Sequence, residues 1–303
     1  MYYIIKIIME YLYFYVMQQE IYIHNYKILE KLGKGAFSTV FKGIHRINKK
    51  LVAIKIEKTA TTLKHESKIL SYLNRELPGS PNFPTLFWYG LYGNNICLTT
   101  TFYKMSLPEY VEKIGKDELK LLGLCEKLIL AIKQLHSTFV VHSDIKPDNF
   151  MVDERENVVI IDFGLSSLYY NAEKDVYKEN VKSADLIGSA KYASYNLHLG
   201  NSVGPRDDLI SIGYLFITIF GIVLPWSCCQ IESELPIYHV MHPANVERGK
   251  LKRLELLKNY LEENGPNPVV NHYLIPYLEA VYGLEYLDKP NYGELKTIFI
   301  TLY

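Results

Sequence analysis

The sequence has few cysteines and no excess charge of either sign. Its four cysteines, Cys97, Cys125, Cys228 and Cys229, lack the spacing of a zinc site, and adjacent cysteines suit neither an ordinary disulfide nor a shared metal. Lys plus Arg and Asp plus Glu both number 33, so no overall field draws the chain to nucleic acid or to an anionic membrane. We therefore expect reduced thiols, a cytoplasmic or nuclear location and no nucleic-acid partner.

A long uninterrupted apolar run is also missing. A membrane-spanning helix needs about 20 mainly apolar residues, but Lys6 and Glu10 interrupt the Tyr- and Ile-rich start of the chain. The start also lacks the small cleavage-site residues of a signal peptide. We expect residues 1–25 to be an N-terminal extension, either a short element packed on the next domain or sequence upstream of a true start at Met9 or Met17.

What is present is enough apolar sequence for a large core. Apolar residues make up 49% of the 303 positions, which excludes an intrinsically disordered chain. The first third combines strand patterns with one helical pattern, and longer helical patterns follow. The predicted strands are 26–43 (a hairpin), 51–57, 95–100, 150–152 and 158–161, and the predicted helices are 63–70, 107–114 and 118–136. We therefore predict an α+β fold.

The densest group of chemically useful side chains lies at residues 142–150 (HSDIKPDNF). Phosphoryl transfer needs an oriented hydroxyl, a positive charge on the moving phosphoryl group and metal ions that hold the nucleotide. We predict that Asp144 accepts the hydroxyl proton, that Lys146 neutralises the phosphate and that Asn149 binds Mg²⁺ through its amide oxygen. A charged surface turn is the alternative, because short motifs recur by chance.

A second metal ligand is predicted after the strand at 158–161, which leads into Asp162-Phe163-Gly164. A carboxylate at the end of a buried strand is costly unless it meets a cation. Asp162 is therefore predicted to bind the Mg²⁺ that bridges the nucleotide phosphates. Such a tripeptide can be a plain turn, but its spacing after the first motif favours the metal site.

A glycine-containing turn in the first hairpin is predicted to hold phosphates. Gly33 and Gly35 let backbone N–H groups approach phosphate, Phe37 would cap the loop tip and Val40 would lie over adenine. Ser38 stands where a third glycine is usual. An isolated G-x-G is weak evidence, and an ordinary hairpin turn is the alternative.

Lys55 interrupts the apolar pattern of the strand at 51–57. We predict that it binds the α and β phosphates and is held by a glutamate from the next helix. Glu66 is the predicted partner, with Glu57 and Glu76 as less well placed competitors. A solvated lysine on an edge strand is the alternative.

The strand at 95–100 is predicted to end in a hinge, residues 101–104. Backbone groups of Phe102 and Tyr103 would pair with adenine, and Thr100 would control the back of that pocket. Successive threonines are also simply good strand formers.

These motifs together resemble those of protein kinases, and residues 188–200 (GSAKYASYNLHLG) narrow the resemblance. Most protein kinases close this segment with Ala-Pro-Glu, whereas this one is similar to the casein kinase I family. Further segments similar to that family are 144–150, 206–214, 224–226 and 286–292.

The resemblance covers about residue 26 to the end and implies a bilobal Ser/Thr protein kinase that uses ATP and Mg²⁺. The implied small lobe, 26–100, is an antiparallel β lobe with one main helix. The implied large lobe, 101–303, is mostly α-helical, and ATP is expected between the lobes. Protein substrates, no membrane span and a monomeric state are expected.

The resemblance also implies roles for individual residues. Ser189 matches the hydroxyl that braces Asp144 and Lys146, with an ordinary turn serine as the alternative. Asp208 matches a buried aspartate that holds the catalytic-loop backbone, and a helix N-cap is a second, compatible role. Lys191 matches a residue that receives an acidic or phosphorylated group of the substrate, with a solvated lysine as the alternative. The expected nucleotide-binding set is completed by Leu32, Lys34, Ala36, Ala53 and Met151.

The substrate face departs from the family. Acidic residues within 227–234 replace a basic cluster, which weakens the case for phosphorylated substrates, although Lys250, Lys252 and Arg253 are expected to compensate in part. No long tail follows Tyr303, so no regulation by a C-terminal extension is expected.

Two other functions remain open from the sequence. A pseudokinase scaffold is favoured by Ser38, Ser143 and the divergent substrate face. Against it, the residues predicted for nucleotide binding, catalysis and metal binding are all present, namely Lys55, Glu66, Asp144, Lys146, Asn149 and Asp162. Phosphotransfer to a small molecule would share the ATP-binding half, whereas the segment 191–200 favours protein substrates.

Ser143 stands where the family usually has an arginine. In many kinases that arginine pairs with a phosphate on the activation loop. We expect no activation by loop phosphorylation, so phosphatase treatment should leave the rate of phosphate transfer unchanged. A many-fold change in rate through that loop would contradict this.

Overall fold

The computed structural model describes residues 20–35, 38–58, 61–171, 174–228, 239, 253–263 and 267–300. The chain divides into two compact units. The first consists of the described parts of Met1–Ser67 and Thr85–Phe102, and the second of Lys68–Pro84 and the described parts of Tyr103–Tyr303. The boundary between Phe102 and Tyr103 falls inside the segment predicted as a hinge.

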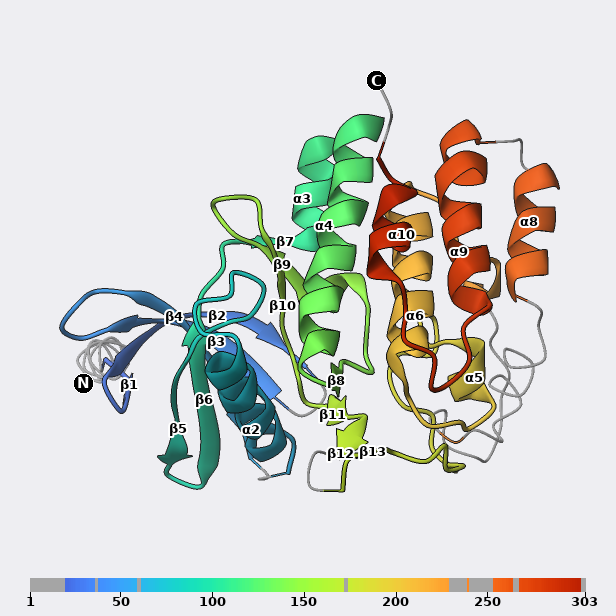
Figure 1. The fold of residues 1–303 in the computed structure, drawn as a ribbon. Coiled ribbons are helices and arrows are strands. Elements are labelled where there is room, and N and C mark those ends of the chain that lie inside the picture. The colour runs from blue at the N-terminus through green and yellow to red at the C-terminus, as the bar shows by residue number, and fades with distance from the viewer. Residues whose placement is uncertain are drawn as a thin grey trace, which may run out of the picture. The chain divides into compact units, whose positions relative to one another are not determined.

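The first unit contains a six-stranded antiparallel sheet in the order β1-β2-β3-β4-β6-β5 (Figure 1). The predicted hairpin is β2 and β3, and the sheet begins before residue 26 because β1 pairs with β2. The strands are β1 (Tyr22–Ile23), β2 (Tyr26–Lys34), β3 (Ser38–His45), β4 (Leu51–Glu57), β5 (Leu86–Tyr92) and β6 (Asn95–Thr101).

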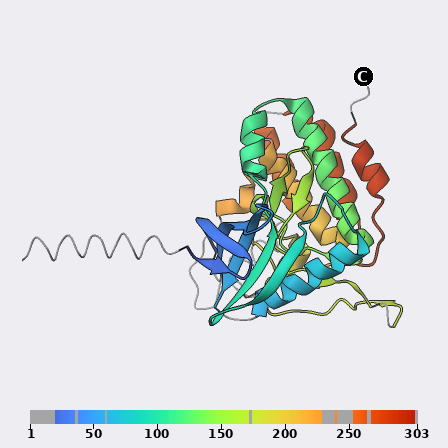
Figure 2. The same cartoon turned by 90° about the vertical axis from the view of Figure 1, so that its left-hand side faces the viewer.

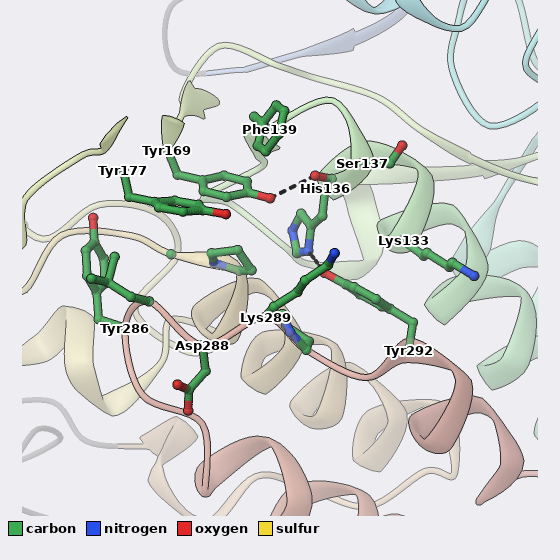
Figure 3. A pocket seen from close by; sticks show the side chains of 14 residues that line it. Lys133, His136, Ser137, Phe139, Tyr169, Tyr177, Tyr286, Asp288, Lys289 and Tyr292 are labelled. Carbon is green, nitrogen blue, oxygen red and sulfur yellow. Dashed lines mark hydrogen bonds between the residues drawn. The ribbon is translucent and has the colours of Figure 1, made fainter. Parts of the chain in front are cut away.

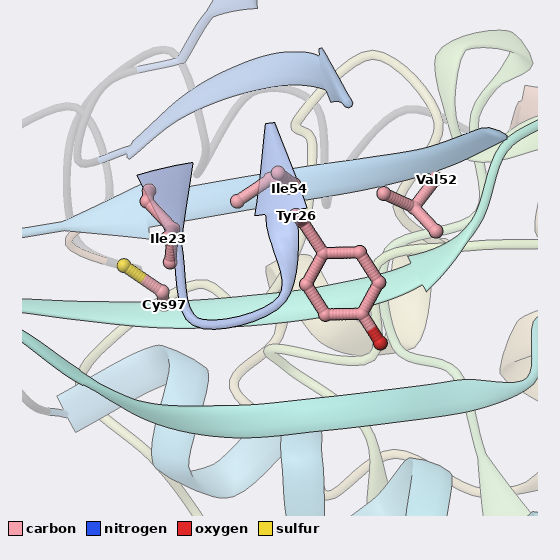
Figure 4. Packing of buried hydrophobic residues seen from close by; sticks show 5 residues of the cluster. All are labelled: Ile23, Tyr26, Val52, Ile54 and Cys97. Atoms are coloured by element: carbon pink, nitrogen blue, oxygen red, sulfur yellow. The ribbon is translucent and has the colours of Figure 1, made fainter. Parts of the chain in front are cut away.

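Side-chain alternation gives this sheet two apolar faces. On one face Ile23, Tyr26, Val52, Ile54 and Cys97 form a buried cluster (Figure 4). The alternate residues Ile96 and Leu98 pack with Leu63 of helix α2 (Thr61–Glu76). Lys55 pairs directly with Leu98 in the sheet register, so its side chain lies on the α2 face.

The second unit is mainly helical, and the two views agree that α4, α6, α9 and α10 lie side by side (Figures 1 and 2). Its short strands form one three-stranded antiparallel sheet and two antiparallel pairs. The helices are α3 (Leu107–Ile114), α4 (Glu118–Ser137), α5 (Tyr195–His198), α6 (Pro205–Ile219), α8 (Arg253–Glu263), α9 (Ile275–Tyr282) and α10 (Tyr292–Thr297). The strands are β7 (Met105–Ser106), β8 (Val140–Val141), β9 (Phe150–Val152), β10 (Val158–Ile160), β11 (Ser167–Leu168), β12 (Tyr170–Asn171) and β13 (Val176–Tyr177).

The predicted α+β class, with a small antiparallel β lobe and a larger helical lobe, is confirmed. Within the described residues, no helix is long and apolar enough to span a membrane.

Helices α6 and α9 approach closely because α6 has a glycine at the contact. A Cβ atom added at Gly213 would lie 2.4 Å from Leu278 Cδ2 and 3.2 Å from Tyr277 Cε1, and both side chains belong to α9. All three residues are buried, so the interface has little room to adjust.

Gly213→Ala should therefore destabilise the protein by about 1–3 kcal/mol through overpacking, despite a gain of about 1 kcal/mol in helix propensity. The measurement is the midpoint of thermal unfolding. Gly123→Ala in α4 is the matched control, because a Cβ atom there meets nothing within 4 Å and only the propensity gain applies. Equal midpoints for the two variants would contradict the packing argument.

Candidate active site

Lys55 and Glu66 form an ion pair in the first unit. Lys55 Nζ lies 2.8 Å from Glu66 Oε2, and the two side chains are 18% and 7% exposed. The competing glutamates are otherwise engaged. Glu57 accepts hydrogen bonds from Thr62 Oγ1 and the Leu63 backbone at the start of α2, and Glu76 pairs with Arg75.

The glycine-containing turn leaves open space beside the backbone. A Cβ atom added at Gly33 would meet no atom within 4 Å, and the Gly35 N–H donates to the Ser38 carbonyl across the turn. Leu32, Gly33 and Lys34 are exposed, as a surface that receives a ligand requires. The predicted contacts at Ala36 and Phe37 lie outside the described residues.

The other residues predicted to bind nucleotide are all partly buried. Val40, Ala53, Thr100 and Phe102 belong to the first unit, on β3, β4, β6 and directly after β6. Tyr103 and Met151, the latter on β9, belong to the second unit.

The catalytic-loop backbone in the second unit is anchored by Asp208 of α6. The Asp208 carboxylate accepts the backbone N–H of His142 at 2.6 Å and that of Ser143 at 2.9 Å. His136 at the end of α4 adds a contact of 2.9 Å from Nε2. Burial alone would raise the pKa of Asp208, but the hydrogen bonds and charge of these groups outweigh it and lower that pKa.

The second possible role of Asp208, helix capping, belongs instead to Asp207. The Asp207 carboxylate accepts the Gly204 N–H at 2.9 Å and hydrogen bonds from Ser194 and Asn196. This ties the start of α6 to the start of α5. Burial raises the pKa of Asp207 despite these donors.

His142 is held in a single orientation by two backbone groups. Its Nε2 lies 3.0 Å from the Ile161 carbonyl and must donate, while its Nδ1 accepts the Asp144 N–H at 3.3 Å. The ring also packs edge-on against Phe163, with centroids 5.5 Å apart. His142 therefore links the loop that carries Asp144 to the segment that carries Asp162.

Asp144, Lys146 and Ser189 come together as predicted from the resemblance. Lys146 Nζ lies 2.6 Å from Asp144 Oδ2 and 3.3 Å from Ser189 Oγ, and Ser189 Oγ donates to Asp144 Oδ1 at 2.7 Å. Both carboxylate oxygens are thus fixed by a hydroxyl and an ammonium group. The Asp144 side chain is 11% exposed and that of Lys146 is 27% exposed.

Asn149 and Asp162 are placed beside each other by the backbone. The Ile161 N–H donates to the Asn149 carbonyl at 2.9 Å, and strands β9 and β10 pair directly next to it. Asn149 Nδ2 donates to the Asp144 carbonyl at 2.7 Å, which leaves the amide oxygen as its metal-binding atom. Asp162 has a φ of 64°, which turns it out of the strand direction.

Residues 26–257 match the family model described as protein kinase domain. The chain belongs to the protein kinase family. It is also 27% identical over 286 residues to casein kinase I homolog 3 of Schizosaccharomyces pombe, an alignment that covers 92% of this chain and 62% of that protein. The predicted resemblance to casein kinase I is confirmed, and the chain spans about 62% of the length of this curated relative.

Protein kinases use ATP and Mg²⁺, and the residues of this kinase fit both. Mg²⁺ is usually bound by one or two protein oxygen ligands together with phosphates and water, and Asn149 and Asp162 supply such a pair. Larger clusters of His, Cys, Asp or Glu that could hold a metal are absent from the described residues. The two described free cysteines, Cys97 and Cys125, are buried, which raises the pKa of both thiols.

Lys191 is exposed, whereas Arg253 is not available to a substrate. Arg253 is 1% exposed, donates to the Ala193 carbonyl at 2.5 Å and lies over the rings of Trp226 and Tyr214. The expectation that Arg253 compensates for the missing basic cluster is therefore wrong. Its role is to brace the segment that carries Lys191, and the pattern of the sequence gave no signal for it. Lys250 and Lys252 lie outside the described residues.

Ser143 adopts a left-handed conformation with a φ of 72° and is 5% exposed. The Ser143 carbonyl oxygen blocks a side chain at position 188: a Cβ atom added to Gly188 would lie only 2.3 Å from it. Gly188 itself has a φ of 82°. The segment that carries Ser189 can approach Asp144 only because residue 188 is a glycine.

Gly188→Ala should therefore reduce kcat of this kinase by at least about tenfold, the equivalent of 1.4 kcal/mol, because Ser189 is displaced from Asp144. The measurement is phosphate transfer at saturating ATP. Gly221→Ala is the matched control, since its φ is 76° but a Cβ atom there meets nothing within 4 Å. It should lower stability by about 1–2 kcal/mol and keep kcat. An equal loss of kcat in both variants would contradict the contact argument.

Proposed function

We propose that this chain is a Ser/Thr protein kinase that transfers the γ-phosphate of ATP to Ser or Thr residues of protein substrates. The observation that carries the proposal is the cluster of Asp144, Lys146 and Ser189 beside Asn149. Asn149 Nδ2 also lies 3.1 Å from Asp144 Oδ2, so the predicted base and the predicted metal ligand are adjacent.

Each of these residues has a defined role in the proposed reaction. ATP would supply the phosphoryl group, and Asn149 and Asp162 would hold the Mg²⁺ that offsets the charge on its phosphates. Asp144 orients the substrate hydroxyl and accepts its proton, while Lys146 offsets the charge on the transferring group. Ser189 keeps the Asp144 carboxylate in position. Lys55, held by Glu66, binds the α and β phosphates.

Acidic protein substrates are part of the proposal. Lys191 is exposed and offers a cation on the segment that follows Ser189. Arg253, the one cation of residues 250–253 that the structure describes, is buried. It therefore adds no support for a strong preference for phosphorylated substrates. We further propose a monomer in the cytoplasm or nucleus that binds no nucleic acid, in keeping with the balanced charge.

A pseudokinase scaffold is the second candidate. Ser38 and Ser143 replace residues that most kinases keep, which favours it. The intact ion pair of Lys55 and the fixed Asp144 carboxylate favour turnover.

The test is transfer of labelled phosphate to casein and to two peptides, one with an acidic residue upstream of the target serine and one with alanine there. Asp162→Asn should abolish transfer to below about 1% of the wild-type rate, because one metal ligand is lost. The acidic peptide should have the lower KM.

Four other results would separate the alternatives. ATP binding without any transfer by the wild-type protein would identify a pseudokinase. Phosphotyrosine as the labelled product would exclude the Ser/Thr assignment, and equal rates on the two peptides would exclude only the acidic preference. Transfer that survives Asp162→Asn would contradict the metal site.

A further inference from the structure

A pocket of about 380 Å³ lies in the second unit (Figure 3). None of its lining residues is assigned to catalysis, although His136 in its wall contacts Asp208, the anchor of the catalytic loop. It is formed by the C-terminal end of α4, the β12–β13 region and the segment that precedes α10. Its volume is within the range of sites that bind small ligands or single side chains. Five of its lining residues have Phe or Tyr rings, namely Phe139, Tyr169, Tyr177, Tyr286 and Tyr292.

Apolar groups at the mouth of the pocket are unusually exposed. Tyr177 is 45% exposed and stacks on Tyr169 with centroids 6.1 Å apart. Leu287 is 61% exposed and Phe139 is 36% exposed. Large apolar side chains that gather around a hollow in this way mark an interaction site more often than singly scattered ones do.

The deeper wall is rigid because its polar atoms are satisfied internally. The Tyr169 hydroxyl donates to the His136 carbonyl at 2.8 Å, and the Tyr292 hydroxyl lies 2.6 Å from His136 Nδ1 (Figure 3). Burial raises the pKa of Tyr169 to about 12, so its hydroxyl brings no negative charge. A wall that is already ordered costs little conformational entropy on binding.

The charge at the rim is positive. Lys133 of α4 and Lys289 are exposed lining residues, and neither forms an ion pair with any residue in the described part of the chain. The one acidic lining residue, Asp288, accepts the Glu285 N–H at 2.8 Å. In Figure 3 its carboxylate points away from the aromatic rings, whereas the Lys289 side chain extends toward them.

We propose that this pocket docks a segment of a partner protein that presents an aromatic or large apolar side chain flanked by acidic residues. The apolar side chain enters between the aromatic walls, and the flanking carboxylates pair with Lys133 and Lys289. This docking goes beyond the proposed transfer reaction and does not depend on it. The two rim lysines select for acidic flanks, while the ring-lined hollow supplies the affinity.

The probe is a fluorescent peptide with a central phenylalanine and two glutamates on each side, and its anisotropy is followed as protein is added. Binding should saturate with wild-type protein and weaken as salt rises. Lys133→Glu combined with Lys289→Glu should weaken it at least about tenfold, the equivalent of 1.4 kcal/mol. Lys113→Glu combined with Lys116→Glu is the matched control, because these lysines are also exposed but line no part of the pocket.

A second set of measurements tests the apolar half. A peptide with alanine in place of phenylalanine, and the exposed-wall variant Tyr177→Ala, should each lose at least about tenfold in affinity. Asp162→Asn should bind the peptide as the wild type does, so failure of catalysis cannot be mistaken for failure of docking. Unchanged thermal midpoints would show that the variants are folded.

Three results would overturn the proposal. They are no saturable binding to the wild type below about 1 mM, equal affinity in the two double-lysine variants, and tighter binding of a peptide with lysine flanks than of one with glutamate flanks.

Discussion

The catalytic loop of this kinase depends on one buried carboxylate. Asp208 accepts the backbone N–H groups of His142 and Ser143 and contacts His136 Nε2, so one side chain of α6 fixes both the catalytic loop and the end of α4. Hydrogen bonds to an ionised group contribute about 1.5–3 kcal/mol each, and without them a buried charge would be strongly unfavourable. This anchor sets the backbone conformation of Ser143 and the position of Asp144. It also places the Ser143 carbonyl oxygen where only a glycine fits at position 188.

Strand geometry provides the corresponding constraint in the first unit. Because successive residues of β4 point to opposite faces, burying Val52 and Ile54 in one cluster places Lys55 on the face that α2 covers. Glu57 then fixes the start of α2 by accepting hydrogen bonds from Thr62 and Leu63. Glu66 lies about one helical turn further along α2, where it pairs with Lys55. The apolar pattern of β4 thus decides on which face of the sheet the ion pair between Lys55 and Glu66 forms.

Local patterns predicted most elements, including β4, α3 and α4, because alternation and helical periodicity are written into consecutive residues. The cluster of Asp144, Lys146 and Ser189 was predictable only through the resemblance, since Ser189 is far away in the sequence. Arg253 was misjudged because its burial depends on Trp226 and Tyr214, which local spacing cannot bring together. The roles of Gly188 and His136 likewise depend on tertiary contacts.

The neighbouring aspartates at the start of α6 have opposite effects on acid tolerance. The pKa of Asp207 is higher in the folded protein than in the unfolded chain, so the native state gains stability as acidification protonates it. The pKa of Asp208 is lower in the folded protein, so the native state loses stability when that group is protonated. Acidification therefore acts in two stages. Protonation of Asp207 adds stability above the ordinary aspartate pKa, and protonation of Asp208 removes stability below it.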